Sequence, residues 1–226
     1  MGSSFNYFSE AFNWVSLVLA LIFFARFSKS NKWLSVYLII LPFLVLWMNH
    51  EAYQLKNNMH LKHVLAHFEI SIFSLYYYFL FEKLFFKRLV LGLFVVYIIF
   101  SVFDTIYYEP FSTYPSNIGF VYSLMVILYS LLFFFEIYEK GEVLYIERHP
   151  HFWINSALLI YYSGTLILGL FINYLMYRIP REKFFDFDTF FSAMTIVFNV
   201  LVCIGLSIEA YQNRKIKSEK PEPTWN

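Results

Sequence analysis

The chain has 226 residues, of which 59% are hydrophobic, 23% are aromatic and only 15% are charged. A soluble domain carries roughly 25% charged residues, so this chain has too few charges to cover its surface and most of it should contact lipid. A formal net charge of +1 excludes the broad basic surface of a nucleic-acid-binding protein, and the single cysteine, Cys203, excludes an internal disulfide.

Seven mostly apolar segments of membrane-spanning length follow one another along the chain. A helix needs about 20 such residues to cross a hydrocarbon core of roughly 30 Å. The predicted spans, in chain order, are residues 11–27, 32–49, 64–81, 89–104, 119–138, 152–176 and 189–211. The sequence therefore predicts an all-α membrane protein, a seven-transmembrane helix bundle.

The Lys and Arg residues of the connecting segments predict the direction of the bundle. With the N-terminus outside, 12 of the 17 basic residues lie in inner segments, and the outer loop of residues 105–118 contains none. Cytoplasmic loops are enriched in Lys and Arg, so we expect the N-terminus outside and the C-terminus in the cytoplasm.

The chain is expected to divide into a transmembrane domain, residues 1–212, and a basic cytoplasmic tail, residues 213–226. The tail contains four basic residues followed by Pro221 and Pro223, a composition typical of disorder. Its charges are interpreted as an orientation signal, with binding to anionic lipid or to a partner as the alternative. No positive charge precedes the first span, so we expect a permanent helix there rather than a cleaved signal peptide.

Two predicted spans carry polar residues at helical spacing. In the third span they recur every three or four residues on one face: His60, His63, His67, Ser71, Ser74 and Tyr78. The last span has a second such face: Asp188, Ser192, Thr195, Asn199 and Cys203. Because polar side chains in membrane spans usually point into the bundle, we expect both faces to lie inside it.

Polar residues at similar outer depths in several spans indicate a candidate ligand-binding pocket that opens outward. Its predicted members are His50, Glu51, His67, Glu69, Asp104, Asn173 and Asn199. The alternative interpretation is that these residues form interhelical hydrogen bonds, each contributing about 0.6 to 2 kcal/mol to helix packing. The sequence leaves both interpretations open.

Three histidines near the start of the third span, His60, His63 and His67, are weak candidates for metal ligands, because imidazoles four residues apart on a helix can share one ion. No second histidine pair lies on another predicted span to complete such a site. The last span contains no lysine to form a Schiff base, which excludes a retinal protein. The sequence predicts no cofactor.

Residues 148–173 resemble a signature of small, uncharacterised bacterial seven-helix membrane proteins. Matching positions at the start and centre of the sixth span are Pro150, Phe152, Trp153, Ile154, Ile160, Tyr161, Ser163 and Gly164. The third span, around Phe68 and Glu69, and the last span, around Asn199 and Gly205, are similar too. Such proteins are often encoded beside sensor histidine kinases, so the resemblance implies a bacterial inner-membrane protein with a role in signal input. It implies no catalytic residues.

The leading hypothesis is therefore a sensory or signal-transduction accessory protein that binds an unknown small ligand and contacts a signalling partner, such as a histidine kinase, on the cytoplasmic side. A membrane-embedded enzyme using His63, His67 and either Glu51 or Glu69 is one alternative. A small transporter or channel is another, with Glu69, Asp104 and Asn199 along its path.

Overall fold

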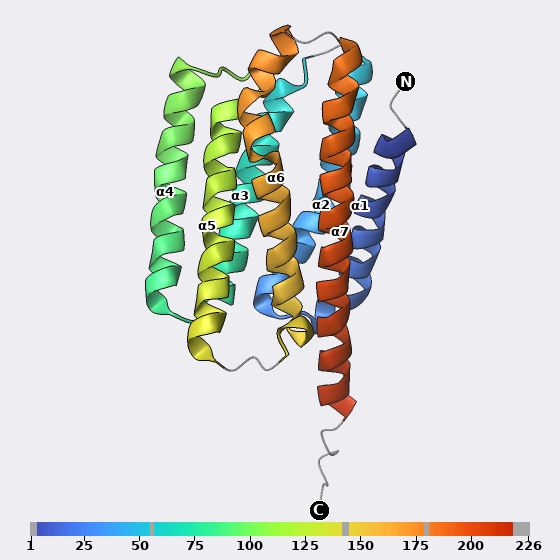
Figure 1. Ribbon diagram of the computed structural model, residues 1–226, viewed down its shortest axis with the longest axis vertical. Helices are drawn as coiled ribbons and strands as arrows, with labels where there is room; N and C mark the ends of the chain where they lie inside the picture. The colour runs from blue at the N-terminus through green and yellow to red at the C-terminus, as the bar shows by residue number, and fades with distance from the viewer. Residues whose placement is uncertain (1–3, 55–56, 142–144, 179–180, 219–226) are drawn as a thin grey trace, which may run out of the picture.

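The computed structural model describes residues 4–54, 57–141, 145–178 and 181–218, and it confirms an all-helical bundle. The elements, in chain order, are α1 (Ser4–Phe23), η1 (Phe24–Arg26), α2 (Lys29–Tyr53), α3 (Met59–Leu80), α4 (Leu84–Tyr107), α5 (Ser116–Lys140), η2 (Ile146–Arg148), α6 (Pro150–Arg178) and α7 (Arg181–Ser218). The described ranges contain no β-strand. The long helices run alternately up and down (Figure 1).

Six of the seven long helices contain stretches that are long and apolar enough to cross a membrane: 9–26, 29–53, 84–107, 116–140, 150–175 and 189–214. These stretches indicate a multi-pass membrane protein. The exception is α3, a predicted span whose early residues include Lys62, His63, His67 and Glu69. These polar side chains lower the hydropathy of α3, and ten of its 22 residues are buried in the bundle.

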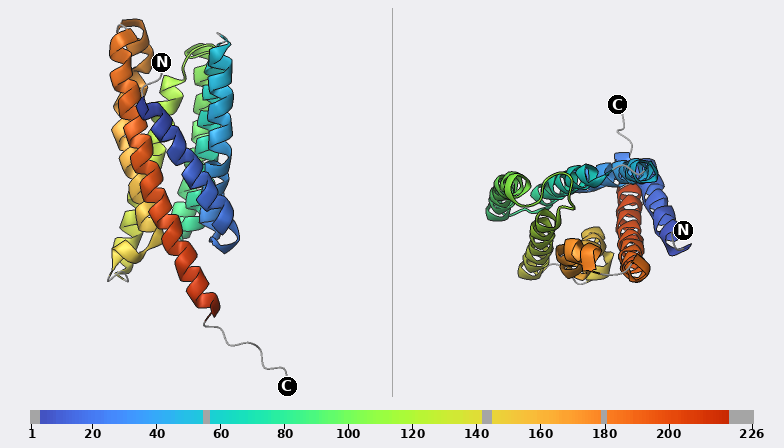
Figure 2. Two further views of the ribbon diagram at one scale, coloured as in Figure 1. Left: turned by 90° about the vertical axis from the view of Figure 1, so that its right-hand side faces the viewer. Right: turned by 90° about the horizontal axis from the view of Figure 1, so that it is seen from above.

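Neighbouring helices along the chain also pack side by side. In addition, α7 closes the arrangement by packing against α1, and α3 contacts α5 as well as α2 and α4. Viewed from above, the helices surround a common interior (Figure 2). We call the end of the bundle where α1 begins the N-terminal end, and the opposite end, from which the last turns of α7 emerge, the C-terminal end (Figure 1).

The surface of α4 shows which side faces lipid. Its exposed side chains are almost all aliphatic or aromatic: Leu91, Val95, Val96, Ile99, Val102, Phe103 and Ile106. The opposite side carries the buried residues Val90, Tyr97 and Ser101. An apolar outer surface with polar atoms turned inward is the arrangement that a hydrocarbon solvent requires.

Aromatic side chains fill the middle of the bundle. The Phe73 ring of α3 lies 5.0 Å from the Tyr37 ring of α2 and 5.8 Å from the Tyr162 ring of α6, measured between ring centroids. One turn further along α3, Tyr76 and Tyr77 are fully buried. Offset and edge-to-face contacts of this kind add to the packing energy of buried rings. This aromatic layer therefore joins helices from both sides of the bundle.

Helix boundaries depart most from the predicted spans in α7. This helix begins at Arg181 and ends at Ser218, whereas the apolar segment alone predicted 189–211. A helix of 38 residues is about 57 Å long, which is nearly twice the thickness of a hydrocarbon core. The first six residues of the predicted disordered tail are therefore helical, and residues 219–226 lie outside the described ranges.

Candidate functional site

A cavity of about 720 Å³ opens among α3, α5, α6 and α7 in the N-terminal half of the bundle. We call it the Glu69 cavity. The α3 residues that line it run from Met59 to Glu69, which corresponds to a depth of about 15 Å. Its volume falls within the roughly 300–1,000 Å³ of small-molecule sites in proteins. The cavity therefore reaches from the end of the bundle to about half of the membrane thickness.

Glu69 lies at the deep end of this cavity and is 8% exposed. The Tyr37 hydroxyl donates a hydrogen bond of 3.0 Å to its Oε1 atom. The side chains of Tyr122 and Tyr162 lie near the same carboxyl group. A buried carboxylate needs such donors, because it has left water and cannot satisfy its own lone pairs. Tyrosines from α2, α5 and α6 therefore surround one acidic group, and Tyr37 holds it by a hydrogen bond.

Tyrosine rings form much of the cavity wall. Tyr122 comes from α5 and Tyr161 from α6, while Tyr114 belongs to the segment before α5. Tyr161 also packs against Phe198 of α7, with 5.5 Å between the ring centroids, so the same ring serves packing and the cavity wall. Tyr114 lies between a predicted pair of spans in a proline-flanked segment, and nothing in its spacing pointed to a site.

Of the seven residues predicted to form an outer pocket, only Glu69 lines the cavity. His67 lies on another face of α3: its Nδ1 atom is 2.7 Å from the His63 carbonyl oxygen and its Nε2 atom is 3.1 Å from Ser101 Oγ. His50 is exposed near the end of α2 and contacts Gln54, and Glu51 is half-buried beside it.

The predicted residue Asn199 belongs to a contact between α7 and α1. Its Nδ2 atom donates to Asn13 Oδ1 at 2.9 Å, and its Oδ1 atom accepts a hydrogen bond from Ser16. All three side chains are buried. This is interhelical hydrogen bonding of the kind that the alternative interpretation described. Asp188 lies in α7, in a part where the structure does not describe side chains.

The structure brings two other predicted residues, Asp104 and Asn173, into one cluster at the N-terminal end. We call Asp104, Glu109, Asn117 and Asn173 the carboxylate cluster. Asn117 Nδ2 donates to Asp104 Oδ1 at 2.9 Å, while the Asn117 backbone N–H donates to Glu109 Oε2 at 2.9 Å. Asn173 Nδ2 donates to Glu109 Oε1 at 3.1 Å and to the Tyr114 carbonyl at 2.9 Å. The cluster therefore supports one wall of the Glu69 cavity.

Glu109 was not predicted as a site residue, because it lies in a loop where a carboxylate normally contacts water. Here it is only 9% exposed. Burial raises the pKa of Glu109 to about 7, and the nearby Asp104 carboxylate acts in the same direction. Asp104 Oδ2 is buried without a hydrogen-bond partner among the described residues.

The three candidate metal ligands do not converge. His60 is exposed, while His63 is buried and its Nε2 atom lies 3.1 Å from the Thr113 carbonyl oxygen. His67 contacts backbone and Ser101, as described above. Within the described ranges, no three His, Cys, Asp or Glu side chains are close enough together to hold a metal ion.

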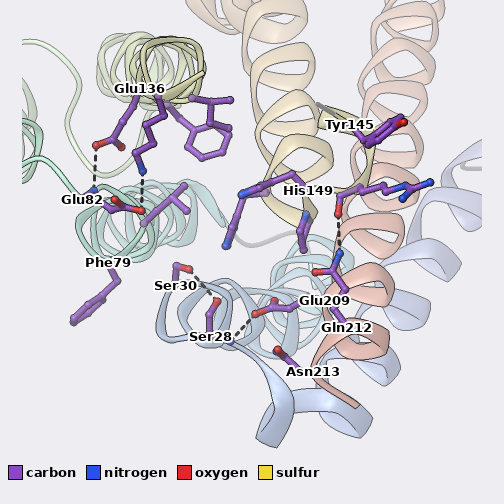
Figure 3. Close-up of a pocket in the computed structure, with 17 residues that line it drawn as sticks. Ser28, Ser30, Phe79, Glu82, Glu136, Tyr145, His149, Glu209, Gln212 and Asn213 are labelled. Atoms are coloured by element: carbon purple, nitrogen blue, oxygen red, sulfur yellow. Dashed lines mark hydrogen bonds and ion pairs between the residues drawn. The ribbon is translucent and has the colours of Figure 1, made fainter. Parts of the chain in front are cut away.

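A second cavity, of about 730 Å³, lies at the C-terminal end of the bundle (Figure 3). We call it the C-terminal pocket. Glu136 Oε1 accepts hydrogen bonds from the backbone N–H groups of Glu82 and Lys83 at 3.2 and 2.9 Å, at the start of α4. Glu209 Oε1 likewise accepts from the Ser28 N–H at 2.7 Å, at the start of α2. Both carboxylates therefore cap helix N-termini, where negative charge is favourable.

Other polar groups of the C-terminal pocket also have partners. Lys140 forms an ion pair of 2.7 Å with Glu82, and Gln212 of α7 donates to the Arg148 carbonyl at 2.8 Å. Burial lowers the pKa of His149, and the Lys140 charge acts in the same direction, so that imidazole is neutral at neutral pH. These contacts join the segment between α3 and α4 to α5, and α7 to the segment before α6, and they indicate a structural role.

The two cavities share no lining residue, and the aromatic layer separates them. On the side of the C-terminal pocket, the Tyr76 hydroxyl lies 3.2 Å from His151 Nδ1. The Tyr77 hydroxyl donates to Asn155 Oδ1 at 2.7 Å. In the described part of the chain, these two cavities therefore lie at opposite ends of the bundle, with buried aromatic rings between them.

In comparisons with known proteins, no protein family, curated protein or solved structure matches the chain.

Proposed function

We propose that this protein is a receptor-like signalling accessory of the bacterial inner membrane, with the N-terminus outside, that binds a small ligand in the Glu69 cavity. The observation that carries the proposal is a 720 Å³ cavity with one positioned carboxylate at its deep end. The 12-to-5 distribution of basic residues supports the orientation, which makes this cavity outward-facing. The resemblance of residues 148–173 to proteins encoded beside sensor kinases supports the signalling role.

The helix α7 supplies a physical connection between the ligand cavity and the cytoplasmic side. Its residue Phe191 lines the Glu69 cavity, and its residues Glu209 and Gln212 line the C-terminal pocket. Beyond that pocket the helix continues to Ser218, past the end of the bundle (Figure 1). If α7 can occupy two positions in the bundle, a ligand with higher affinity for the protein in one of them shifts the population toward that position. A cytoplasmic partner such as a histidine kinase would then detect the change at the projecting end of α7.

The proposal is tested by filling the cavity in the living cell. A Cβ atom added at Gly169, which lines the cavity, meets no atom within 4 Å, so Gly169→Leu occupies cavity volume without a backbone clash. Gly92→Leu on the exposed side of α4 is the matched control, because a Cβ there also meets nothing within 4 Å. We expect gene deletion and Gly169→Leu to change transcription of the neighbouring genes, and Gly92→Leu to leave it unchanged. Unchanged transcription in the deletion strain under all conditions would contradict the signalling role.

Transport is a second candidate, favoured by the presence of one cavity at each end of the bundle. It requires the aromatic layer to open, since Phe73, Tyr76 and Tyr77 are fully buried there. Net uptake of a cavity ligand by proteoliposomes would favour this alternative over the receptor.

A further inference from the structure

The Glu69 cavity has an uneven distribution of charge along its depth. Among the described residues that line it, Glu69 is the one carboxylate and Lys62 the one cation. Lys62 lies seven residues earlier on α3, about 10 Å closer to the N-terminal end. The Lys62 charge acts on Glu69 through the cavity, but Glu69 is the charged residue at the deep end and so is the one nearest to a deeply bound ligand.

The hydrogen bonds of Glu69 leave room for one more donor. An ionised carboxylate accepts at about four lone-pair positions. Within the described part of the chain, the Tyr37 hydroxyl donates to it at 3.0 Å, and the Tyr122 and Tyr162 side chains lie nearby. The carboxylate also forms part of the cavity lining. A ligand N–H group is the donor that would complete its hydrogen bonding, and a charged donor would do so most strongly.

The walls around this carboxylate suit a cation with apolar substituents. Tyr114, Tyr122 and Tyr161 present aromatic rings, whose faces carry partial negative charge and attract ammonium groups. Small and aliphatic residues form other parts of the wall, including Ala66, Leu166 and Ile172. This combination of carboxylate, aromatic rings and aliphatic surface differs from a site for an inorganic ion, which would need several polar ligands.

We propose that the Glu69 cavity binds a small organic ammonium ion, with its charged nitrogen beside Glu69 and its apolar part against the tyrosine and aliphatic walls. The inference rests on the proposed function, because it names the ligand class of the same cavity. It predicts preference for a cation over a neutral or anionic molecule of the same size.

The test measures binding of three probes of similar shape to the purified full-length protein in lipid nanodiscs by calorimetry. The probes are 2-phenylethylammonium, 2-phenylethanol and 3-phenylpropionate. We expect the ammonium probe to bind at least about tenfold more tightly than the other two. Glu69→Gln should remove that preference, Gly169→Leu should weaken binding of every probe, and Glu69→Asp, which keeps the charge, should retain part of the preference. Glu139→Gln, an exposed site outside both cavities, is the control and should bind as wild type.

Three results would overturn the inference: equal binding of the three probes, tightest binding of the anion, or an ammonium affinity that Glu69→Gln leaves unchanged. Absence of binding by all three probes would overturn it as well. The proposed function fails separately. If the ammonium probe binds as expected but gene deletion leaves transcription of the neighbouring genes unchanged, the ligand class is supported and the signalling role is contradicted. If Gly169→Leu changes transcription but the ammonium probe does not bind, the signalling role is supported and the ligand class is contradicted.

Discussion

Gly205 lies where α7 passes closest to the start of α6. A Cβ atom placed on Gly205 would lie 2.7 Å from the Pro150 carbonyl oxygen and 2.7 Å from Ile154 Cγ1, inside van der Waals contact. At Gly164, by contrast, an added Cβ would meet the flexible Met194 side chain at 3.1 Å. Small residues let membrane helices approach closely, and Gly205 is the position where backbone limits the approach. The resemblance singled out both glycines, but only the structure distinguishes them.

Replacing Gly205 by alanine should therefore force α6 and α7 apart and destabilise the fold by about 1–3 kcal/mol. The control Gly92→Ala, whose Cβ meets nothing within 4 Å, should have a neutral or slightly stabilising effect, because alanine has the higher helix propensity. Thermal unfolding of the two variants in the same detergent measures the difference. Equal midpoints for Gly205→Ala and Gly92→Ala would show that the close contact contributes nothing.

The end of α4, the start of α5 and the last turns of α6 are joined by the carboxylate cluster. Asp104, Asn117 and Asn173 come from these three helices and Glu109 from the loop between two of them. Burial at this junction holds the pKa of Glu109 at about 7, above the 4.5 of a free glutamate. The folded protein therefore binds more protons than the unfolded chain between these two pH values. Its stability consequently falls as the pH rises from about 4.5 to 7.

A pH titration of stability tests this element. We expect the wild-type protein to unfold more easily at pH 8 than at pH 5.5, with roughly 1–3 kcal/mol of the difference due to Glu109. Glu109→Gln keeps the shape and cannot ionise, so it should flatten the profile over this range. Glu139→Gln, at an exposed position, should keep the wild-type profile. A Glu109→Gln profile as steep as the wild type would assign the pH dependence to other groups.

For the whole molecule, the orientation in the membrane is the property that decides which cavity faces outward. Both ends offer exposed tyrosines for labelling: Tyr53, 85% exposed, at the N-terminal end and Tyr138, 84% exposed, at the C-terminal end. The chain has one native cysteine, Cys203, which can be replaced to give a cysteine-free background.

In that background, Tyr53→Cys should react with a membrane-impermeant maleimide on intact cells, and Tyr138→Cys should react only after the membrane is permeabilised. This result follows from the positive-inside distribution of basic residues. The unsubstituted background is the control for non-specific labelling. The opposite pattern would reverse the orientation and make the C-terminal pocket the outward-facing cavity.

Hydropathy and helical periodicity predicted the helical bundle and most of its spans, because a membrane span needs a long apolar run whichever helices it packs against. The contacts of the polar residues were harder to predict than the spans. The depth of a residue along its helix can be read from the sequence, but the neighbour that its side chain faces depends on how the helices pack. Asn199 and Glu69 were both predicted members of the outer pocket, yet the first contacts α1 and the second lines a cavity. Tyr114 and Glu109 come from a loop without periodicity, so their places required the folded chain.

The unbroken length of α7 restricts how the two ends of the molecule can move relative to each other. The helix touches the Glu69 cavity through Phe191, is held against α6 at Gly205, and reaches the C-terminal pocket through Glu209. An added Cβ at Gly205 would already overlap the Pro150 carbonyl oxygen, so a larger residue of α7 that slid to this level would clash with α6. We therefore expect a ligand-dependent movement of α7 to be a tilt about the Gly205 contact, which would move the projecting end opposite to the cavity end.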